Sequence, residues 1–144
     1  MDLRQITPEF AVAPQIDGDD VQALANAGYR TIIANRPDNE IEDGFDSSEL
    51  AKRAQDAGLA VHYLPYFPGA MTPELVAEFE AVMAKAEGPV FAYCRSGTRS
   101  SHLWAMSQAG TRDIEEILTL AAAAGYDLRP MEGLLRAYGS QKHS

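Results

Sequence analysis

Three glycines spaced thirty residues apart are the feature that most constrains the fold of this chain of 144 residues. Gly28, Gly58 and Gly88 each follow a helix-like pattern and precede a short apolar run. Glycine is favoured just after a helix because it adopts a positive φ angle at no steric cost. A helix, a glycine and a strand that recur at this interval have the length of a βα unit. The spacing therefore predicts parallel strands connected by helices.

The apolar runs after these glycines are expected to be strands that are covered on both faces. They lie at residues 31–34, 60–64 and 90–93. Largely apolar strands are typical of parallel sheets between two helical layers. Two further runs, at residues 3–6 and 10–13, are short enough to be edge strands. We therefore predict an α/β fold with a mostly parallel central sheet that is flanked by helices.

The helical segments are indicated by their start signals and by their apolar spacing. Asp17 and Ser47 are good N-caps, and Thr72 is followed by Pro73, which fits the first position of a helix. Beyond the last strand, helical patterns cover residues 100–108, 113–124 and 131–138. Because no linker or low-complexity tract divides the chain, we expect residues 1–144 to form a single domain.

The charge balance limits the partners that such a domain could bind. The chain has 12 Lys and Arg against 21 Asp and Glu, which gives a net charge of −9. A surface with this excess of acid repels other polyanions, so we expect neither nucleic acid nor a membrane as a partner. The first residues lack the pattern of a secretory signal, and no apolar run approaches the roughly 18 residues of a membrane span. A cytoplasmic protein is therefore expected.

The single cysteine, Cys94, cannot form an internal disulfide and has no neighbour at a metal-ligand spacing. His62 and His102 also lack a second ligand at such a spacing, so we expect no metal and no cofactor. Any chemistry of Cys94 is then that of a thiol. A lone cysteine can also be a small buried apolar residue with no chemical role, and composition alone does not distinguish these two alternatives.

Cys94 lies directly after the strand at residues 90–93, and parallel sheets bind ligands at the carboxyl ends of their strands. Gly97 permits a tight loop whose backbone N–H groups converge at the start of the next helix. From Gly88 to Arg112, 25 residues contain no Asp or Glu, where the composition would give about 3 to 4. Basic residues and a helix N-terminus both stabilise a thiolate. The pattern predicts a reactive cysteine in an anion-binding loop.

The sequence of this loop, residues 93–100, resembles the active-site loop of rhodanese-type sulfurtransferases. Together with residues 2–7, 13–16, 33–38 and 68–72, it is similar to the beta-lactamase-hydrolase-like, phosphatase-like domain family, which is also described as a family of sulfur transferases. The resemblance covers about residues 1–110. It implies a dual-specificity-phosphatase-like fold. Relatives fused to persulfide dioxygenases imply a role in sulfide handling, with such a dioxygenase as a partner.

Departures from the phosphatase pattern make sulfur transfer the leading hypothesis. Dual-specificity phosphatases have His-Cys, five intervening residues and Arg, whereas Tyr93 precedes Cys94 and only four residues separate Cys94 from Arg99. Their acidic proton donor has no counterpart in residues 65–70. A leaving sulfite or thiolate needs no such donor. A cysteine-dependent phosphatase is the alternative, and a non-catalytic anion-sensing or thiol-sensing module is the third hypothesis.

In the leading hypothesis, Cys94 takes a sulfane sulfur from thiosulfate or glutathione persulfide and passes it to a thiol, sulfite or cyanide. Arg99 is the second catalytic residue, because its charge stabilises the thiolate and the persulfide. Asp38 is expected to be a turn residue, although it is the one carboxylate nearby that could serve as an acid. The residues expected to bind the substrate are Arg36, Arg95, Ser96, Gly97, Thr98 and Ser100.

Overall fold

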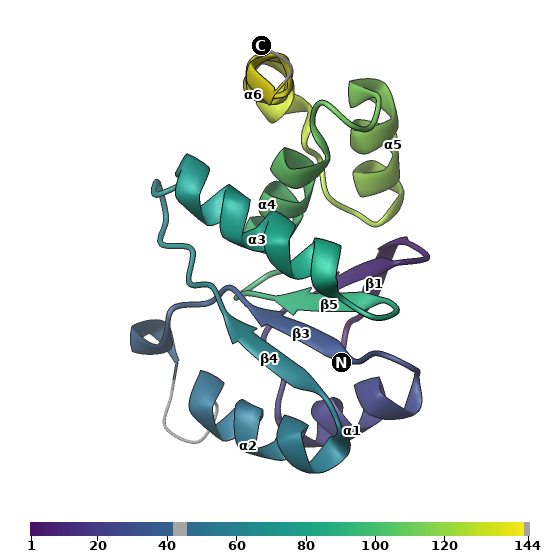
Figure 1. Ribbon diagram of the computed structural model, residues 1–144, viewed down its shortest axis with the longest axis vertical. Helices are drawn as coiled ribbons and strands as arrows, with labels where there is room; N and C mark the ends of the chain where they lie inside the picture. The colour runs from purple at the N-terminus through teal and green to yellow at the C-terminus, as the bar shows by residue number, and fades with distance from the viewer. Residues whose placement is uncertain (42–45, 143–144) are drawn as a thin grey trace.

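The computed structural model describes residues 1–41 and 46–142, and its centre is a five-stranded sheet with the order β1-β2-β5-β3-β4 (Figure 1). The strands are β1 (Arg4–Thr7), β2 (Phe10–Ala13), β3 (Thr31–Ala34), β4 (Ala60–Tyr63) and β5 (Val90–Tyr93). Only the β1–β2 pair is antiparallel among these, and the three other pairs are parallel. The predicted mostly parallel sheet is confirmed.

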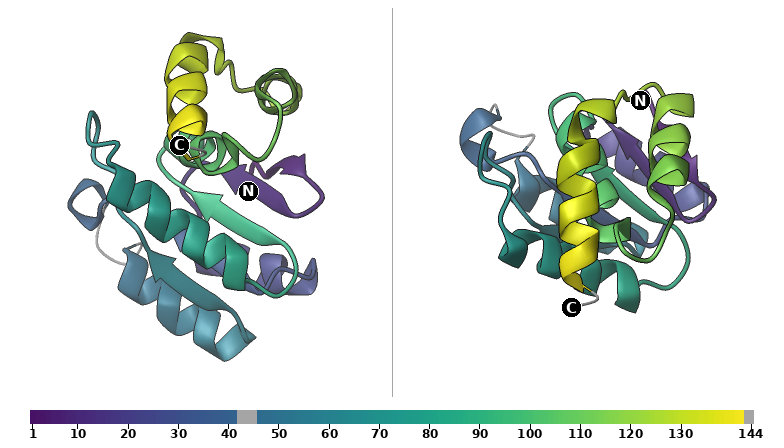
Figure 2. Two further views of the ribbon diagram at one scale, coloured as in Figure 1. Left: turned by 45° about the horizontal axis from the view of Figure 1, so that its top comes forward. Right: turned by 90° about the horizontal axis from the view of Figure 1, so that it is seen from above.

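Helices cover both faces of the sheet. One face packs against α1 (Gly18–Asn26) and α2 (Ser47–Ala57), and the other against α3 (Pro73–Lys85) and α4 (Thr98–Gln108) (Figure 1). An outer layer over α4 contains α5 (Ile114–Ala123) and α6 (Glu132–Lys142), as Figure 2 shows. Two short 3₁₀ helices complete the elements, η1 (Asp38–Glu40) and η2 (Arg129–Met131). No helix in the described ranges is long and apolar enough to cross a lipid bilayer.

Alternation along the strands produces one hydrophobic core on each side of the sheet. Phe10 and Val12 belong to the core under α3 and α4, whereas Ala11 and Tyr93 belong to the core over α1 and α2. Successive side chains of a strand point to opposite faces. The residue after Tyr93, which is Cys94, is therefore directed toward the face that α4 covers.

Two strands occupy places that their sequences did not predict. β2 is not an edge strand, because it lies between β1 and β5 and all four of its residues are buried. β4 pairs with β3 alone in the described chain, and its Ala60, His62 and Tyr63 are exposed rather than covered on both faces. The order of strands depends on where the crossover helices pack, and a local apolar run carries no information about that.

The start of α4 also differs from the sequence pattern by two residues. We expected the helix to begin at Ser100, but it begins at Thr98 because Gly97 is its N-cap. Gly97 has a φ of 90°, a conformation that residues with a side chain rarely adopt. This glycine reverses the chain after β5 within a few residues and brings the start of α4 next to Cys94.

Candidate active site

Cys94 lies at the carboxyl end of the central strand, where three strands meet. Its N–H donates to Ala13 O at the end of β2 (3.4 Å), and Asn35 N donates to Tyr93 O from the end of β3 (2.9 Å). Tyr66, in the loop after β4, joins this edge by donating its N–H to Asn35 O (2.8 Å). Cys94 itself is completely buried at the base of its loop. The sheet thus places one thiol at the point where ligands of parallel sheets bind.

The loop from Cys94 to α4 holds the sulfur with a backbone donor. Gly97 N–H donates to Cys94 Sγ at 3.0 Å. The first N–H groups of a helix have no acceptor within it, and Gly97 has no side chain that could accept from them at α4. Thr98 N–H donates to Ser96 Oγ at 3.4 Å. Because Gly97 is the N-cap and its N–H contacts the sulfur, the positive end of the helix dipole lies beside Cys94. The arrangement favours a negative charge, both on the thiolate and on an anion that approaches it.

Arg99 is oriented by a carboxylate that the sequence did not reveal. Its Nη2 donates to Glu40 Oε1 at 2.7 Å and its Nη1 donates to Glu40 Oε2 at 3.1 Å. Nη1 also donates to Tyr66 O at 2.8 Å. Glu40 therefore binds the end of the guanidinium through Nη1 and Nη2. The Nε–H and the second N–H of Nη2 point in parallel from a different edge of the group. Two parallel donors of this kind match two oxygens of a phosphate.

Three arginines, Arg99, Arg36 and Arg95, stabilise the negative charge of the Glu40 carboxylate. The hydrogen bond from Arg99 lowers the pKa of the Glu40 carboxyl below its usual range, and it raises the pKa of Arg99. Arg36 Nε lies 3.7 Å from Glu40 Oε1, and the charge of Arg95 acts in the same direction. Glu40 is thus ionised at neutral pH and fixes the direction of Arg99.

The structure separates the predicted substrate-binding residues into two groups. Arg95, Ser96 and Thr98 are exposed, and Ser96 Oγ donates to Thr98 Oγ1 at 3.0 Å. Ser100 is buried and its hydroxyl donates to Asn35 Oδ1 at 2.9 Å, so its proton is used within the protein and not for a substrate. The prediction for the Ser100 side chain is therefore corrected to a role in joining α4 to β3.

Arg36 is the second residue whose contacts differ from the prediction. Its Nη2 donates to Glu40 O at 2.7 Å and its Nη1 donates to Gln15 Oε1 at 3.3 Å. Both bonds stabilise the loop after β3, and they place Glu40 where Arg99 can reach it. The contacts of Arg36 in the described chain therefore connect it to the site through Glu40.

Asp38 has a structural role, as the sequence predicted for a turn residue. Its carboxylate accepts from both the N–H and the hydroxyl of Ser47 at the start of α2, each at 2.8 Å. Asp38 N–H donates in turn to the Tyr63 hydroxyl at 2.9 Å. A carboxylate engaged in this way joins the loop after β3 to α2 and is not directed toward Cys94 as a proton donor.

Three contributors to the site were not singled out from the sequence. Asn35 follows β3 directly, so the rule that placed Cys94 could also have placed it. Glu40 and Tyr126 had no comparable signal, because they reach the loop from η1 and from the segment after α5. Arg99 is 59 residues from Glu40 in the sequence, and Tyr126 is 30 residues from Ser96. Both contacts therefore depend on tertiary packing alone.

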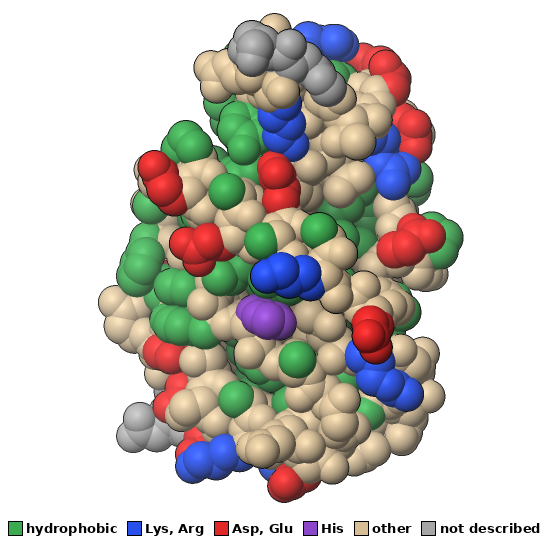
Figure 3. All heavy atoms as spheres, in the orientation of Figure 1, with side chains coloured by type: hydrophobic (Ala, Val, Ile, Leu, Met, Phe, Trp, Pro, Cys, Tyr) green, Lys and Arg blue, Asp and Glu red, His purple; other side chains and the backbone are tan. Residues whose placement is uncertain are grey.

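A separate hollow lies at the other end of the strands. A cavity of about 450 Å³ is lined by His62 of β4 and Lys85 of α3, among other residues. Figure 3 shows acidic and basic side chains interspersed on the face around β4 and α3 rather than gathered into a basic patch. In the residues that the structure describes, no group of three His, Cys, Asp or Glu could hold a metal ion.

The family of the chain follows from its sequence. A sequence model described as the beta-lactamase hydrolase-like protein, phosphatase-like domain, matches residues 2–111. The chain belongs to this family. A beta-lactamase hydrolase-like protein of Xylella fastidiosa is 34% identical over 132 residues, which cover 89% of this chain. They cover only 30% of that relative, so the chain spans less than a third of the curated relative it matches.

Solved structures place the same phosphatase-like domain among phosphatase folds. A candidate phosphatase from Neisseria meningitidis is 32% identical and superimposes with a TM-score of 0.83, covering 96% of this chain and 99% of that one. The structure of PTPMT1 is 15% identical, with a TM-score of 0.77 over 96% of this chain and 94% of that one. The second likeness concerns the fold alone. The predicted phosphatase-like fold and family are confirmed.

A change at Glu40 tests the ion pair and its dependence on pH. Because the pKa of Glu40 is lower in the folded chain than in the unfolded one, its stabilising effect is present above the unfolded pKa and is lost as the pH falls through the folded pKa. Glu40→Gln should lower the free energy of unfolding by about 1 kcal/mol at pH 7. The difference from wild type should shrink as the pH approaches 3.

Urea unfolding at several pH values measures this difference. Glu49→Gln is the matched control. In the described chain the ion pair of Glu49 is with the exposed Lys52, at 3.2 Å. A Glu40→Gln variant whose stability loss stayed constant down to pH 3 would show that the pair with Arg99 is not the source of the effect.

Proposed function

We propose that this chain is a cysteine-dependent phosphatase that hydrolyses phosphate monoesters through a phosphocysteine at Cys94. The observation that carries the proposal is the orientation of Arg99, whose end is held by Glu40 while Gly97 N–H donates to the sulfur in the same loop. The family and the Neisseria meningitidis structure support a phosphatase in preference to a sulfurtransferase. Under this proposal the substrate is a small anion that fits a basic loop in an acidic protein.

The proposed reaction has two displacements at phosphorus. The Cys94 thiolate attacks the phosphorus, the sulfur–phosphorus bond forms, and the bond from phosphorus to the ester oxygen breaks. The free edge of Arg99 and the N–H groups of α4 stabilise the equatorial oxygens. Water then attacks the phosphorus, the sulfur–phosphorus bond breaks, and inorganic phosphate leaves with the thiolate restored.

The leaving group determines which esters this site can hydrolyse. Residues 65–72, in the loop after β4, contain no carboxylate that could protonate a departing oxygen. An aryl ester can depart as a phenolate without a proton, whereas an alkoxide cannot do so readily. We therefore expect aryl phosphates to be better substrates than alkyl phosphates.

Transfer of sulfane sulfur is a second candidate, favoured by one observation. Four residues separate Cys94 from Arg99, a loop one residue shorter than that of dual-specificity phosphatases. The comparisons with known proteins give this candidate no support of their own. In this case thiosulfate or glutathione persulfide would be the donor, a thiol the acceptor, and a persulfide dioxygenase the partner protein.

Mass spectrometry of the quenched protein distinguishes the two reactions. The chain is incubated with p-nitrophenyl phosphate or with thiosulfate, quenched in acid and weighed intact. A phosphatase gains the mass of one phosphoryl group from the first compound, and a sulfurtransferase gains one sulfur atom from the second. Cys94→Ser is the control for both. Sulfur gain without phosphoryl gain or phosphate release would overturn the proposal.

A further inference from the structure

We propose that Tyr126 is a positioning residue for Cys94, acting through the single peptide group that joins Ser96 to Gly97. The proposal depends on the proposed function only in requiring that Cys94 reacts as a thiolate. Tyr126 lies after α5 and outside residues 2–111, the part that the family model matches. The C-terminal helices would then contribute to the site rather than only cover the core.

The geometry that carries the proposal is a chain of two hydrogen bonds. The Tyr126 hydroxyl donates to Ser96 O at 3.3 Å, and Gly97 N–H donates to Cys94 Sγ at 3.0 Å. Ser96 O and Gly97 N belong to the same planar peptide unit, which is trans. In a trans unit the C=O and the N–H point in opposite directions, so the tyrosine and the sulfur bind opposite ends of one dipole.

This arrangement strengthens the donor that faces the sulfur. A hydrogen bond to a carbonyl oxygen draws charge from the N–H of the same peptide and makes it a better donor, an effect of about 10–30% per bond. It also fixes the rotation of the peptide plane, so that the N–H stays directed at the sulfur. Both effects favour the thiolate over the thiol.

Tyr126 is held in place from both sides. Its N–H donates to Ala121 O at 2.9 Å, and the guanidinium carbon of Arg4 lies 5.8 Å from the centre of its ring. Arg4 also donates to Ala124 O at 3.0 Å, which attaches β1 to the end of α5. A side chain at position 97 would collide with the Tyr126 hydroxyl, so the loop and the ring are closely packed.

Charged groups lie near both ends of this chain of hydrogen bonds. Arg99 interacts with Cys94, and its own partner is Glu40. Beside Tyr126 are Arg4 and, through Arg4, Asp2. Burial raises the pKa of the Tyr126 hydroxyl, which therefore remains a donor at neutral pH. Removing this hydroxyl changes the polarisation of the Ser96–Gly97 peptide, whose N–H faces the sulfur, and leaves all these charges in place.

The test measures how fast iodoacetamide alkylates Cys94 as the pH is varied. Tyr126→Phe keeps the ring and its packing, so the chain should fold, and its thermal unfolding is recorded alongside. We expect the midpoint of the rate profile to move upward by about 0.5 pH unit, which is about a threefold slower reaction below the midpoint. The two rates should converge at high pH, where both proteins carry a full thiolate.

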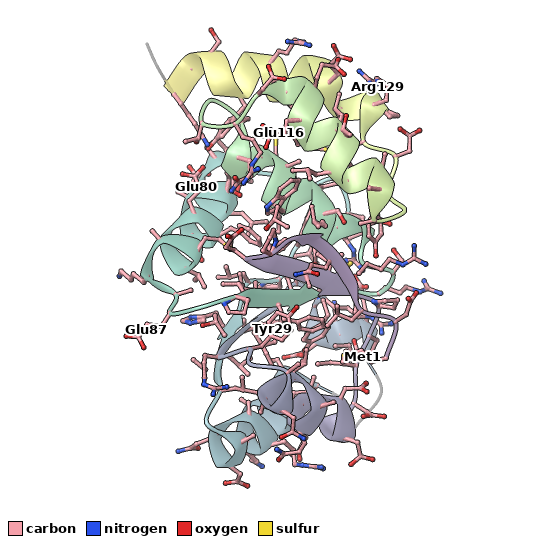
Figure 4. All side chains as sticks on the ribbon, turned by 90° about the vertical axis from the view of Figure 1, so that its right-hand side faces the viewer. Met1, Tyr29, Glu80, Glu87, Glu116 and Arg129 are labelled. Carbon is pink, nitrogen blue, oxygen red and sulfur yellow. The ribbon has the colours of Figure 1, made fainter. Side chains whose placement is uncertain are left out.

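Tyr29→Phe is the matched control, because Tyr29 is as buried as Tyr126 but lies on the side of the sheet that faces α1 (Figure 4). Its profile should coincide with that of wild type. An unchanged midpoint in Tyr126→Phe, or a rate lowered equally at every pH, would overturn the proposal. Alkylation needs no turnover, so this result stands apart from whether phosphate or sulfur is transferred.

Discussion

Replacing Cys94 with serine should lower turnover by at least about 1,000-fold with every substrate of this site and leave the fold intact. The sulfur accepts the Gly97 N–H and lies beside Arg99, so it is the one described nucleophile in this loop that is placed to be a thiolate. A serine hydroxyl in the same place is a far weaker nucleophile, because it stays protonated at neutral pH, whereas a thiol ionises much more readily. The two side chains are close in size, so the buried position should tolerate the change.

Steady-state hydrolysis of p-nitrophenyl phosphate and thiosulfate-to-cyanide transfer both measure this effect. Ser107→Ala on the same helix is the control, because its hydroxyl donates to Trp104 O at 2.6 Å near the far end of α4. That variant should retain the wild-type rate. Substantial turnover by Cys94→Ser would mean that another group is the nucleophile.

Replacing Arg99 with lysine should lower kcat/KM by about 100-fold, although the charge is kept. The guanidinium contacts Glu40 with two nitrogens and Tyr66 O with one of them, and it still has a second edge of two parallel donors. An ammonium group cannot make a bidentate bond to Glu40 and also present a fork to an oxyanion. Both the position of the cation and its contacts with the substrate are therefore lost.

The matched control for this substitution is Arg112→Lys. Arg112 lies in the same acid-free stretch of sequence, but its Nη1 donates to Glu116 Oε1 on the outer helix α5. Its replacement should leave kcat/KM within about twofold of wild type. Equal losses in the two variants would show that general positive charge, and not the fork of Arg99, supports the reaction.

The local structure of the chain was largely predictable because it follows from short-range chemistry. The strands β2, β3 and β5 have the predicted bounds, and the glycines at 28, 58 and 88 all adopt a positive φ. Helix starts depend on caps. Asp17 and Thr72 accept the expected backbone bonds, whereas the N-cap of α2 is Asp46 and not Ser47. The exposed position of β4 at the edge of the sheet was not predicted, because the sequence of one segment does not determine the order of the strands.

The candidate site divides in the same way. The sequence by itself determined that Cys94 ends a strand and that a tight loop and a helix follow, because glycine, a helix start and an absence of acid are local signals. Only the tertiary structure decided the direction of Arg99 and the bond from Tyr126 to the loop. Those contacts join segments that meet only when η1 and the chain after α5 pack at the edge of the sheet. The chain alone thus specifies a thiol at a helix start, and packing specifies the donors and charges around it.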